Sequence, residues 1–254
     1  NNGFTKSVVI AEKREFFKRP TKKLLLDTPK TAILINNENS LLFDSGWEIV
    51  GLASIKLTAC GGEKINISYG ETLAGGHVKR IIGERDFSFD YIAKAGENEY
   101  TNYMFRLAAR YIEITCPDTV SIDSVSIIPQ FYPVKENPVP RLSPEDMSIY
   151  EICLNTLKLC MMEHYVDCPW REQCLYAYDS RNQMLAGYTA FKDKNAEYAR
   201  ANLLLMSKDI REDNLLSICF PSNENLAIPC FSLFYVLAVW EYINNTGDLT
   251  LGKD

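Results

Sequence analysis

The densest cluster of side chains that could do chemistry lies between residues 164 and 179, where acidic, basic and aromatic residues follow one another closely. Those best suited to hold or cleave a small polar molecule are Asp167, Trp170, Arg171, Glu172, Tyr178 and Asp179. Carboxyl groups act as general acid and base on glycosidic bonds. They also accept hydrogen bonds from hydroxyl groups, while aromatic faces cover the apolar side of a sugar ring. The pattern therefore predicts a site for a sugar.

A plainer interpretation of the same residues stays open at this point. Asp167 could cap the N-terminus of a helix that starts near Pro169, which would place Glu172 in the favourable first turn. Acidic residues at helix starts are common. Residue types alone therefore do not choose between a helix cap and a sugar site.

The elements upstream of this cluster are typical of β-structure. Residues 49–57 and 64–69 alternate apolar and polar side chains around a glycine-containing turn, which predicts a hairpin. Further strands are expected at residues 86–92, 111–115 and 121–129. Short strands at this spacing predict a β-sandwich domain over residues 32–132. Residues 1–31 are charged and irregular, and are expected to be an N-terminal arm or the end of a preceding β module.

The pattern changes after a stretch with four prolines between residues 133 and 144, which predicts a semi-rigid linker over 133–143. Ser143 followed by Pro144 is a helix-start signal. Helices are expected over residues 147–163, 180–191, 195–207 and 231–243. The last of them is apolar nearly all round and is expected to be buried. Residues 144–254 are thus expected to open a helical catalytic domain, with the acidic cluster between its first two helices.

Several motifs resemble those of bacterial α-L-rhamnosidases, which are six-hairpin glycosidases. The acidic loop of that family is matched in spacing by Asp167-Cys168-Pro169, Arg171-Glu172 and Asp179. Its β-sandwich strand motifs and its aromatic helix end resemble residues 44–47, 67–73, 105–114 and 240–248. The resemblance covers roughly residues 35–254. It implies a multidomain all-β plus all-α fold, with an antiparallel β-sandwich followed by the first helices of an (α/α) six-hairpin barrel, incomplete in this chain.

The resemblance also implies an inverting glycoside hydrolase that removes terminal α-L-rhamnose or a related sugar. Glu172 would be the catalytic general acid, Asp167 and Asp179 would hold rhamnose hydroxyls, and Arg171 would line the pocket. The catalytic base of the family lies far downstream, so the 254-residue chain is expected to be inactive by itself. Residues 175–179 lack both glycines and the tryptophan of the family's Gly-Trp-x-Gly-Asp run, and Tyr178 could reshape the pocket for another sugar.

Composition limits the partners. The net charge of −6 and the pI near 5.2 argue against a nucleic-acid-binding surface. The sequence has no apolar run of the roughly 18–20 residues that a membrane-spanning helix needs. A carbohydrate, such as a rhamnose-containing glycan or glycoside, is therefore the expected partner, and a homo-oligomer is left open.

The cysteines and histidines indicate neither a metal nor a cofactor. The eight cysteines include no Cys-x-x-Cys pair, and they are expected to be free, buried thiols. Cys160, His164 and Cys168 have helical spacing, but Pro169 interrupts the helix and no fourth ligand is near. Free thiols fit a reducing compartment such as the cytoplasm. The chain does not begin with Met, so a removed leader, and with it a periplasmic or secreted location, stays open.

Two other classes of protein compete with the hydrolase. In the first, the β-sandwich alone binds carbohydrate and the helices serve as a scaffold. In the second, the chain is a catalytically dead relative, as the lost glycines before Asp179 suggest. The joint presence of Asp167, Arg171 and Glu172 weighs against the second interpretation.

Overall fold

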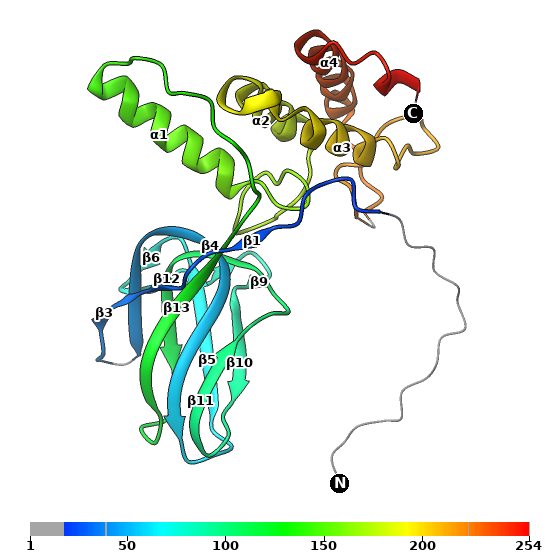
Figure 1. Ribbon diagram of the computed structural model, residues 1–254. Coiled ribbons are helices and arrows are strands. Elements are labelled where there is room, and N and C mark those ends of the chain that lie inside the picture. Colours follow the sequence, from blue (N-terminus) through cyan, green and yellow to red (C-terminus); the bar gives the residue numbers. More distant parts are fainter. Residues whose placement is uncertain (1–17, 39, 223, 254) are drawn as a thin grey trace.

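A computed structural model describes residues 18–38, 40–222 and 224–253, and it shows a curled antiparallel sheet with helices at one end (Figure 1). Residues 1–17 of the expected N-terminal arm lie outside this description. The strands are β1 (Leu25–Leu26), β2 (Lys30–Thr31), β3 (Ile33–Asn36), β4 (Leu41–Ala59), β5 (Lys64–Gly70), β6 (Leu73–Ala74), β7 (His77–Val78), β8 (Ile81–Ile82), β9 (Arg85–Asp86), β10 (Ser88–Ile92), β11 (Gly96–Thr101), β12 (Leu107–Thr115) and β13 (Ser121–Phe131). The strand order β1-β13-β4-β12-β5-β10 forms the sandwich-like layer that the turn spacing predicted.

Strand β4 organises the sheet because its 19 residues pair with four other strands. Its first part pairs with β12 and β3, and its second part pairs with β13 and β11. Gly51 lies where β12 and β13 meet on β4, and a Cβ atom there would be 2.0 Å from the carbonyl oxygen of Ile128. A side chain at this position would therefore push β13 away from β4.

The sandwich core follows the period of two that the sequence predicted. Ile65 and Ile67 of β5 and Ile112 and Ile114 of β12 are fully buried. Asp44 and Arg110 belong to two of the motifs that resemble the family. The carboxylate of Asp44 accepts two hydrogen bonds of 2.9 Å from the guanidinium group of Arg110. Burial of alternate residues and this bidentate pair hold β12 in register on β4.

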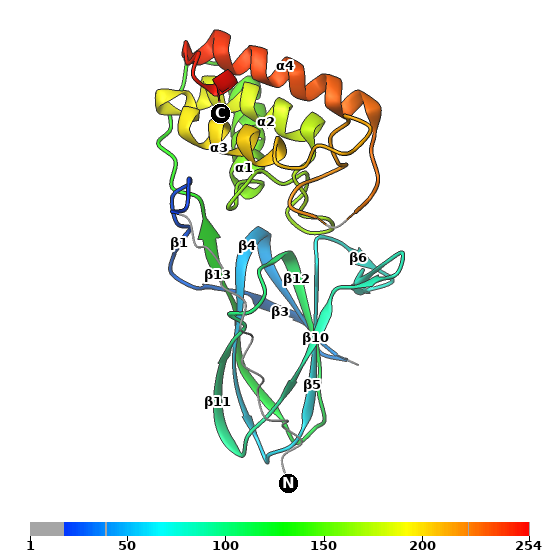
Figure 2. The same ribbon diagram turned by 90° about the vertical axis from the view of Figure 1, so that its right-hand side faces the viewer.

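Two short hairpins, β6–β7 and β8–β9, project from the end of the sandwich that faces the helices (Figure 2). The first is held at its base by Glu113 of β12. Its carboxylate lies 2.6 Å from Nδ1 of His77, accepts a hydrogen bond of 2.9 Å from the backbone N–H of Val78, and accepts another from the hydroxyl of Ser40. His77 is exposed, and it is paired with Glu113.

The helical part contains α1 (Pro144–Leu159), α2 (Ala177–Ala190), η1 (Lys192–Asn195), α3 (Ala196–Met206), α4 (Pro229–Thr246) and η2 (Leu251–Lys253). All four predicted helices form, and their ends differ from the prediction by a few residues. Ser143 Oγ accepts a hydrogen bond of 3.1 Å from the backbone N–H of Asp146, so the predicted helix start is confirmed. Gly247 at φ +74° ends α4 in a left-handed conformation.

The expectation that α4 is buried is wrong. Only Ala238 and Tyr242 are buried, whereas Leu233, Val236 and Trp240 are more than 60% exposed. Figure 2 shows α4 on the outer side of the helices, where no other described element covers this face. Among the described residues the apolar face of α4 is therefore exposed, although its composition is that of a core helix. None of the helices in the described residues combines the length and the hydropathy of a transmembrane span.

The two parts of the fold share a buried junction. Tyr132, directly after β13, packs against Tyr198 of α3 with ring centroids 4.2 Å apart. Arg106, directly before β12, is 9% exposed, and burial lowers the pKa of its guanidinium to about 10, which the charge of Glu163 partly opposes. These contacts join α3 and the loop after α1 to one end of the sandwich.

Candidate active site

The predicted site residues lie in a closed loop between α1 and α2. The backbone N–H of Asp167 donates to the carbonyl oxygen of Cys174 at 2.9 Å, and Cys174 N–H donates to Asp167 Oδ1 at 2.9 Å. Gln173 has φ +54° and its side chain donates to the carbonyl oxygen of Pro169 at 2.7 Å. Residues 169–172 form turns, and α2 starts only at Ala177. Asp167 therefore closes a loop instead of capping a helix at Pro169. We call residues 167–174 the acidic loop.

Within the acidic loop two carboxyl groups share a hydrogen bond. One side-chain atom each of Asp167, Cys168 and Glu172 lies within 4.8 Å of the others. The hydrogen bond to Asp167, followed by burial, raises the pKa of Glu172, and Arg171, whose Nη2 lies 3.4 Å from Glu172 Oε2, opposes this rise only in part. Burial by itself would raise the pKa of Asp167, but hydrogen bonds from Glu172, the Cys168 thiol and backbone N–H groups lower it. Of the two carboxyl groups, Glu172 therefore binds a proton more tightly, and Asp167 loses its proton first.

Asp179 and Tyr176 lie close enough to interact electrostatically with Asp167 and Glu172. Asp179 stands in the first turn of α2, and burial, with the charge of Asp167 as a smaller cause, raises its pKa. Burial and the nearby charges of Cys174 and Glu172 raise the pKa of Tyr176. Tyr178 points elsewhere: its ring packs against Phe234 of α4, with centroids 4.5 Å apart, and is partly exposed. The structure thus gathers the three predicted carboxyl groups and separates Tyr178 from them.

Trp170 lies in the core of the sandwich although it belongs to the acidic loop. It is 8% exposed, and its ring lies 4.6 Å from that of Phe87 between centroids. Gly70 makes room for it, because a Cβ atom there would lie 3.4 Å from Trp170 Cζ2 and 3.2 Å from Val78 Cγ1. The indole therefore packs against protein, and only its edge reaches a cavity. Its contact with a substrate stays a prediction.

Sequence reasoning missed the residues that the sandwich brings to the acidic loop. Arg85 Nη1 donates to the carbonyl oxygen of Arg171 at 2.5 Å, over a separation of 86 residues. Glu71 and Lys79 line a cavity of about 430 Å³ together with Arg171 of the acidic loop. Glu71 stands in the segment 67–73 that resembled a sandwich strand, so its place was visible in the sequence but its neighbours were not.

Asp167, Cys168 and Glu172 are also the one set of three close metal-ligand types among the residues that the structure describes. Cys160 and His164 are not part of it. Cys160 Sγ lies 3.9 Å from the carbonyl oxygen of Asp167, and His164 Nδ1 lies 2.7 Å from its neighbour's carbonyl oxygen. The helical spacing of the two cysteines and the histidine therefore does not gather them into a site.

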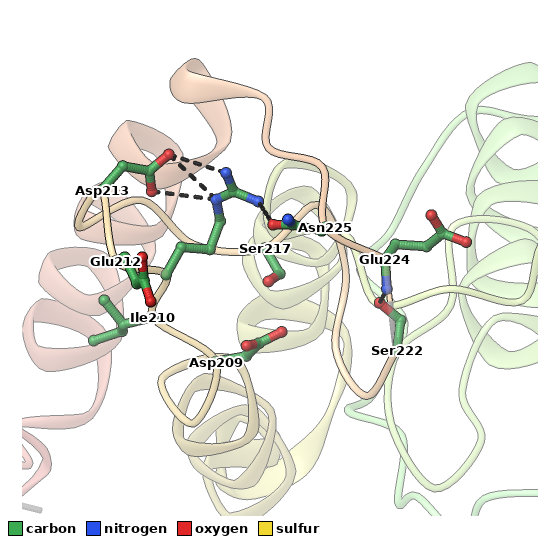
Figure 3. A pocket seen from close by; sticks show the side chains of 9 residues that line it. Asp209, Ile210, Glu212, Asp213, Ser217, Ser222, Glu224 and Asn225 are labelled. Carbon is green, nitrogen blue, oxygen red and sulfur yellow. Dashed lines mark hydrogen bonds and ion pairs between the residues drawn. The ribbon is translucent and has the colours of Figure 1, made fainter.

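A second cavity, of about 590 Å³, lies in the connection between α3 and α4 (Figure 3). Four of its nine lining residues are acidic, and Arg211 pairs there with Asp213 at 3.1 Å and with Asn225. None of the predicted site residues contributes to this lining. The cation is already satisfied by these partners, so the cavity offers no chemistry comparable to that of the acidic loop.

A β-sandwich is joined here to helices, and a hydrogen-bonded pair of carboxyl groups lies in the loop between the first two helices. Residues 35–128 match the model of the bacterial α-L-rhamnosidase concanavalin-like domain, and residues 145–254 match that of the bacterial α-L-rhamnosidase six-hairpin glycosidase domain. Together the two models match most of the chain, which therefore belongs to the bacterial α-L-rhamnosidase family. No curated protein sequence matched it.

Solved structures agree with this assignment. The GH78 family rhamnosidase of Bacillus sp. GL1 is 28% identical, with a TM-score of 0.76, over 94% of this chain and 25% of its own. The rhamnosidase from Klebsiella oxytoca with rhamnose bound is 19% identical, with a TM-score of 0.71, over 86% of this chain and 46% of its own. The Streptomyces avermitilis α-L-rhamnosidase complexed with L-rhamnose is 15% identical, with a TM-score of 0.69, over 91% of this chain and 25% of its own. The chain thus spans between a quarter and a half of these proteins.

Proposed function

We propose that the protein is a glycoside hydrolase that removes terminal α-L-rhamnose, or a closely related sugar, from a glycan or glycoside. Glu172 acts as the general acid, while Asp167 and Asp179 accept hydrogen bonds from sugar hydroxyls and Arg171 lines the pocket. The observation that carries this proposal is the hydrogen-bonded pair of carboxyl groups in the acidic loop. The contact with Asp167 raises the pKa of Glu172, and a raised pKa favours the role of a leaving-group acid.

The stereochemical outcome is proposed as inversion. In an inverting reaction the acid protonates the glycosidic oxygen while a second carboxylate, several ångströms away across the sugar, activates water on the opposite face. Asp167 is hydrogen-bonded to Glu172 and is therefore too close to act as that base. We place the base outside these 254 residues, as the family resemblance implies, and expect this chain to be inactive alone.

The test is hydrolysis of a panel of aryl glycosides, including the α-L-rhamnoside, by the full-length protein. We expect release from the rhamnoside and its loss in Glu172→Gln, which keeps the shape of the side chain but carries no acidic proton. Glu151→Gln on the exposed face of α1 is the matched control and should leave the rate unchanged. Turnover of a different glycoside would change the proposed sugar but not the proposed mechanism. Full activity in Glu172→Gln would refute the assignment of the acid.

If the protein hydrolyses none of the aryl glycosides, a different class of protein is favoured. In that class the sandwich binds carbohydrate and no bond is cleaved. That interpretation expects binding that is insensitive to Glu172. The packing of the acidic loop against the sandwich weighs against it, because Trp170 and Arg171 join the two parts at the carboxyl pair.

A further inference from the structure

The cavity of about 430 Å³ beside the acidic loop is built by both parts of the fold. The sandwich contributes Glu71, Thr72 and Lys79, and the acidic loop contributes Cys168, Trp170 and Arg171. Its volume falls within the range of small-molecule sites, roughly 300–1,000 Å³. The lining therefore combines charged groups of both signs, a hydroxyl and an aromatic edge, which is the mixture that binds a polyhydroxylated molecule.

The cavity lies next to the proposed general acid. Arg171, which lines it, has its Nη2 3.4 Å from Glu172 Oε2. Cys168, which also lines it, has its thiol within 4.8 Å of a Glu172 carboxylate oxygen. A general acid must reach the oxygen between the cleaved sugar and the group that leaves. A leaving group bound beside Glu172 on the sandwich side would therefore enter this cavity.

A second pair of carboxyl groups, Glu48 and Glu71, lies at the cavity, and Glu71 is one of the lining residues. Glu48 lies behind Glu71, and Glu48 Oε1 is buried with no hydrogen-bond donor from the described protein. Two carboxyl groups this close can hydrogen-bond only if one of them is protonated. Burial first, and then the hydrogen bond and charge of Glu71, raise the pKa of Glu48 to about 8. At neutral pH Glu48 therefore keeps its proton, and it can donate a hydrogen bond to Glu71.

The wall that carries these groups is held in place. The backbone N–H of Lys79 donates to the carbonyl oxygen of Thr72 at 3.0 Å, which closes the β6–β7 hairpin. Glu113 binds the same hairpin through His77 and the backbone of Val78. Polar groups on a fixed wall can discriminate between ligands, because an unmatched partner leaves them unsatisfied.

From this geometry we propose that the cavity is the subsite for a sugar leaving group, and that Glu71 and Lys79 select for it by binding its hydroxyl groups. The inference rests on the proposed function and deepens it. The sandwich is then part of the substrate site and contributes to its specificity. A flat aromatic leaving group has no hydroxyls for these two residues, so it gains nothing from them.

The test compares two substrates in the full-length protein, p-nitrophenyl α-L-rhamnoside and a disaccharide in which α-L-rhamnose is linked to glucose. In Glu71→Gln and in Lys79→Ala, we expect kcat/KM for the disaccharide to fall about tenfold, the size of one lost hydrogen bond. The value for the aryl glycoside should change less than about twofold by the same reasoning. Lys79 is exposed, so its replacement does not endanger folding.

Lys56→Ala is the matched control, because Lys56 is an exposed sandwich lysine whose ion pair with Glu99 at 3.2 Å lies outside the cavity. It should leave both substrates unaffected. Equal changes on the two substrates in both cavity variants, or no change on either, would overturn the subsite while leaving the hydrolase function intact. A parent protein that cleaves neither substrate would instead refute the proposed function, and the subsite with it.

Discussion

The indole of Trp170 packs against the ring of Phe87 with centroids 4.6 Å apart, and so ties the acidic loop to the core of the sandwich. Trp170 stands two residues before Glu172. The hydrogen bond from Arg85 to the carbonyl oxygen of Arg171 acts on the residue between them. The backbone that carries the proposed acid is therefore held from the sandwich side by one apolar contact and one polar contact.

Truncation of this indole should cost both stability and rate. Trp170→Ala removes a nearly buried ring, which typically lowers the free energy of unfolding by about 3–5 kcal/mol. We expect kcat to fall with it, even at temperatures where the variant is folded, because Glu172 loses its fixed position. Urea unfolding and rate measurements on the same samples check this. Trp170→Phe, which keeps an aromatic ring against Phe87, should recover much of both. A folded Trp170→Ala with parental kcat would contradict the positioning role.

Local signals were sufficient for much of the fold. Ser143 and Pro144 predicted the start of α1, because capping depends on a few neighbouring residues. The alternation of Ile65 and Ile67 likewise predicted a strand with one buried face. The acidic loop was located by its motif, and its carboxyl groups do come together.

Contacts between distant segments could not be predicted in the same way. The apolar surface of α4 has the composition of a buried helix, but burial depends on which elements cover it, and composition does not report that. Trp170 was predicted to contact the substrate, and the sequence does not show that Phe87 also lies against it. Arg85 and Glu71 reach the acidic loop only through the folding of the sandwich, so no spacing within the chain pointed to them.

The thiols offer a direct check of burial. All eight cysteines are free, but the expectation that they are buried holds only for some. The exposed ones are Cys60, Cys153 and Cys230. Cys160 and Cys219 are buried, and burial raises the pKa of Cys160 to about 12. Iodoacetamide labelling of the native protein, followed by mass spectrometry, should modify the three exposed thiols first, and Cys160 and Cys219 only in denaturant. Rapid native labelling of Cys160 would contradict the described packing of α1.

The Glu113 contacts should make stability depend on pH. Burial by itself would raise the pKa of Glu113, but hydrogen bonds from His77, Ser40 and Val78 lower it overall. A carboxyl group whose folded pKa is depressed stabilises the fold above its unfolded pKa, about 4.3, and this contribution is lost as the pH falls through the folded value. Glu113→Gln should therefore cost about 2 kcal/mol at pH 7.

The cost of Glu113→Gln should shrink as the pH is lowered below about 4, where the parent carboxylate also takes up a proton. Chemical unfolding of both proteins across this range measures the difference. Glu97→Gln, on an exposed strand position, controls for the general loss of a negative charge and should show little effect at either pH. A difference that stays constant down to pH 3 would mean that the ionised form of Glu113 contributes nothing.

The effect of Asp167 on the pKa of Glu172 should be visible in the pH dependence of hydrolysis. The basic limb of kcat/KM reports the pKa of the general acid. Asp167 is the largest cause of the raised pKa of Glu172, so Asp167→Asn should move this limb to lower pH, where Glu172 then loses its proton earlier. Loss of a charged hydrogen bond to the sugar should also lower kcat/KM at the optimum by about tenfold or more. Asp179→Asn is the matched control, because Asp179 is not among the groups that shift Glu172. It should weaken turnover but leave the basic limb in place. If the limb moves equally in both variants, or in neither, the raised pKa of Glu172 does not come from its hydrogen bond to Asp167.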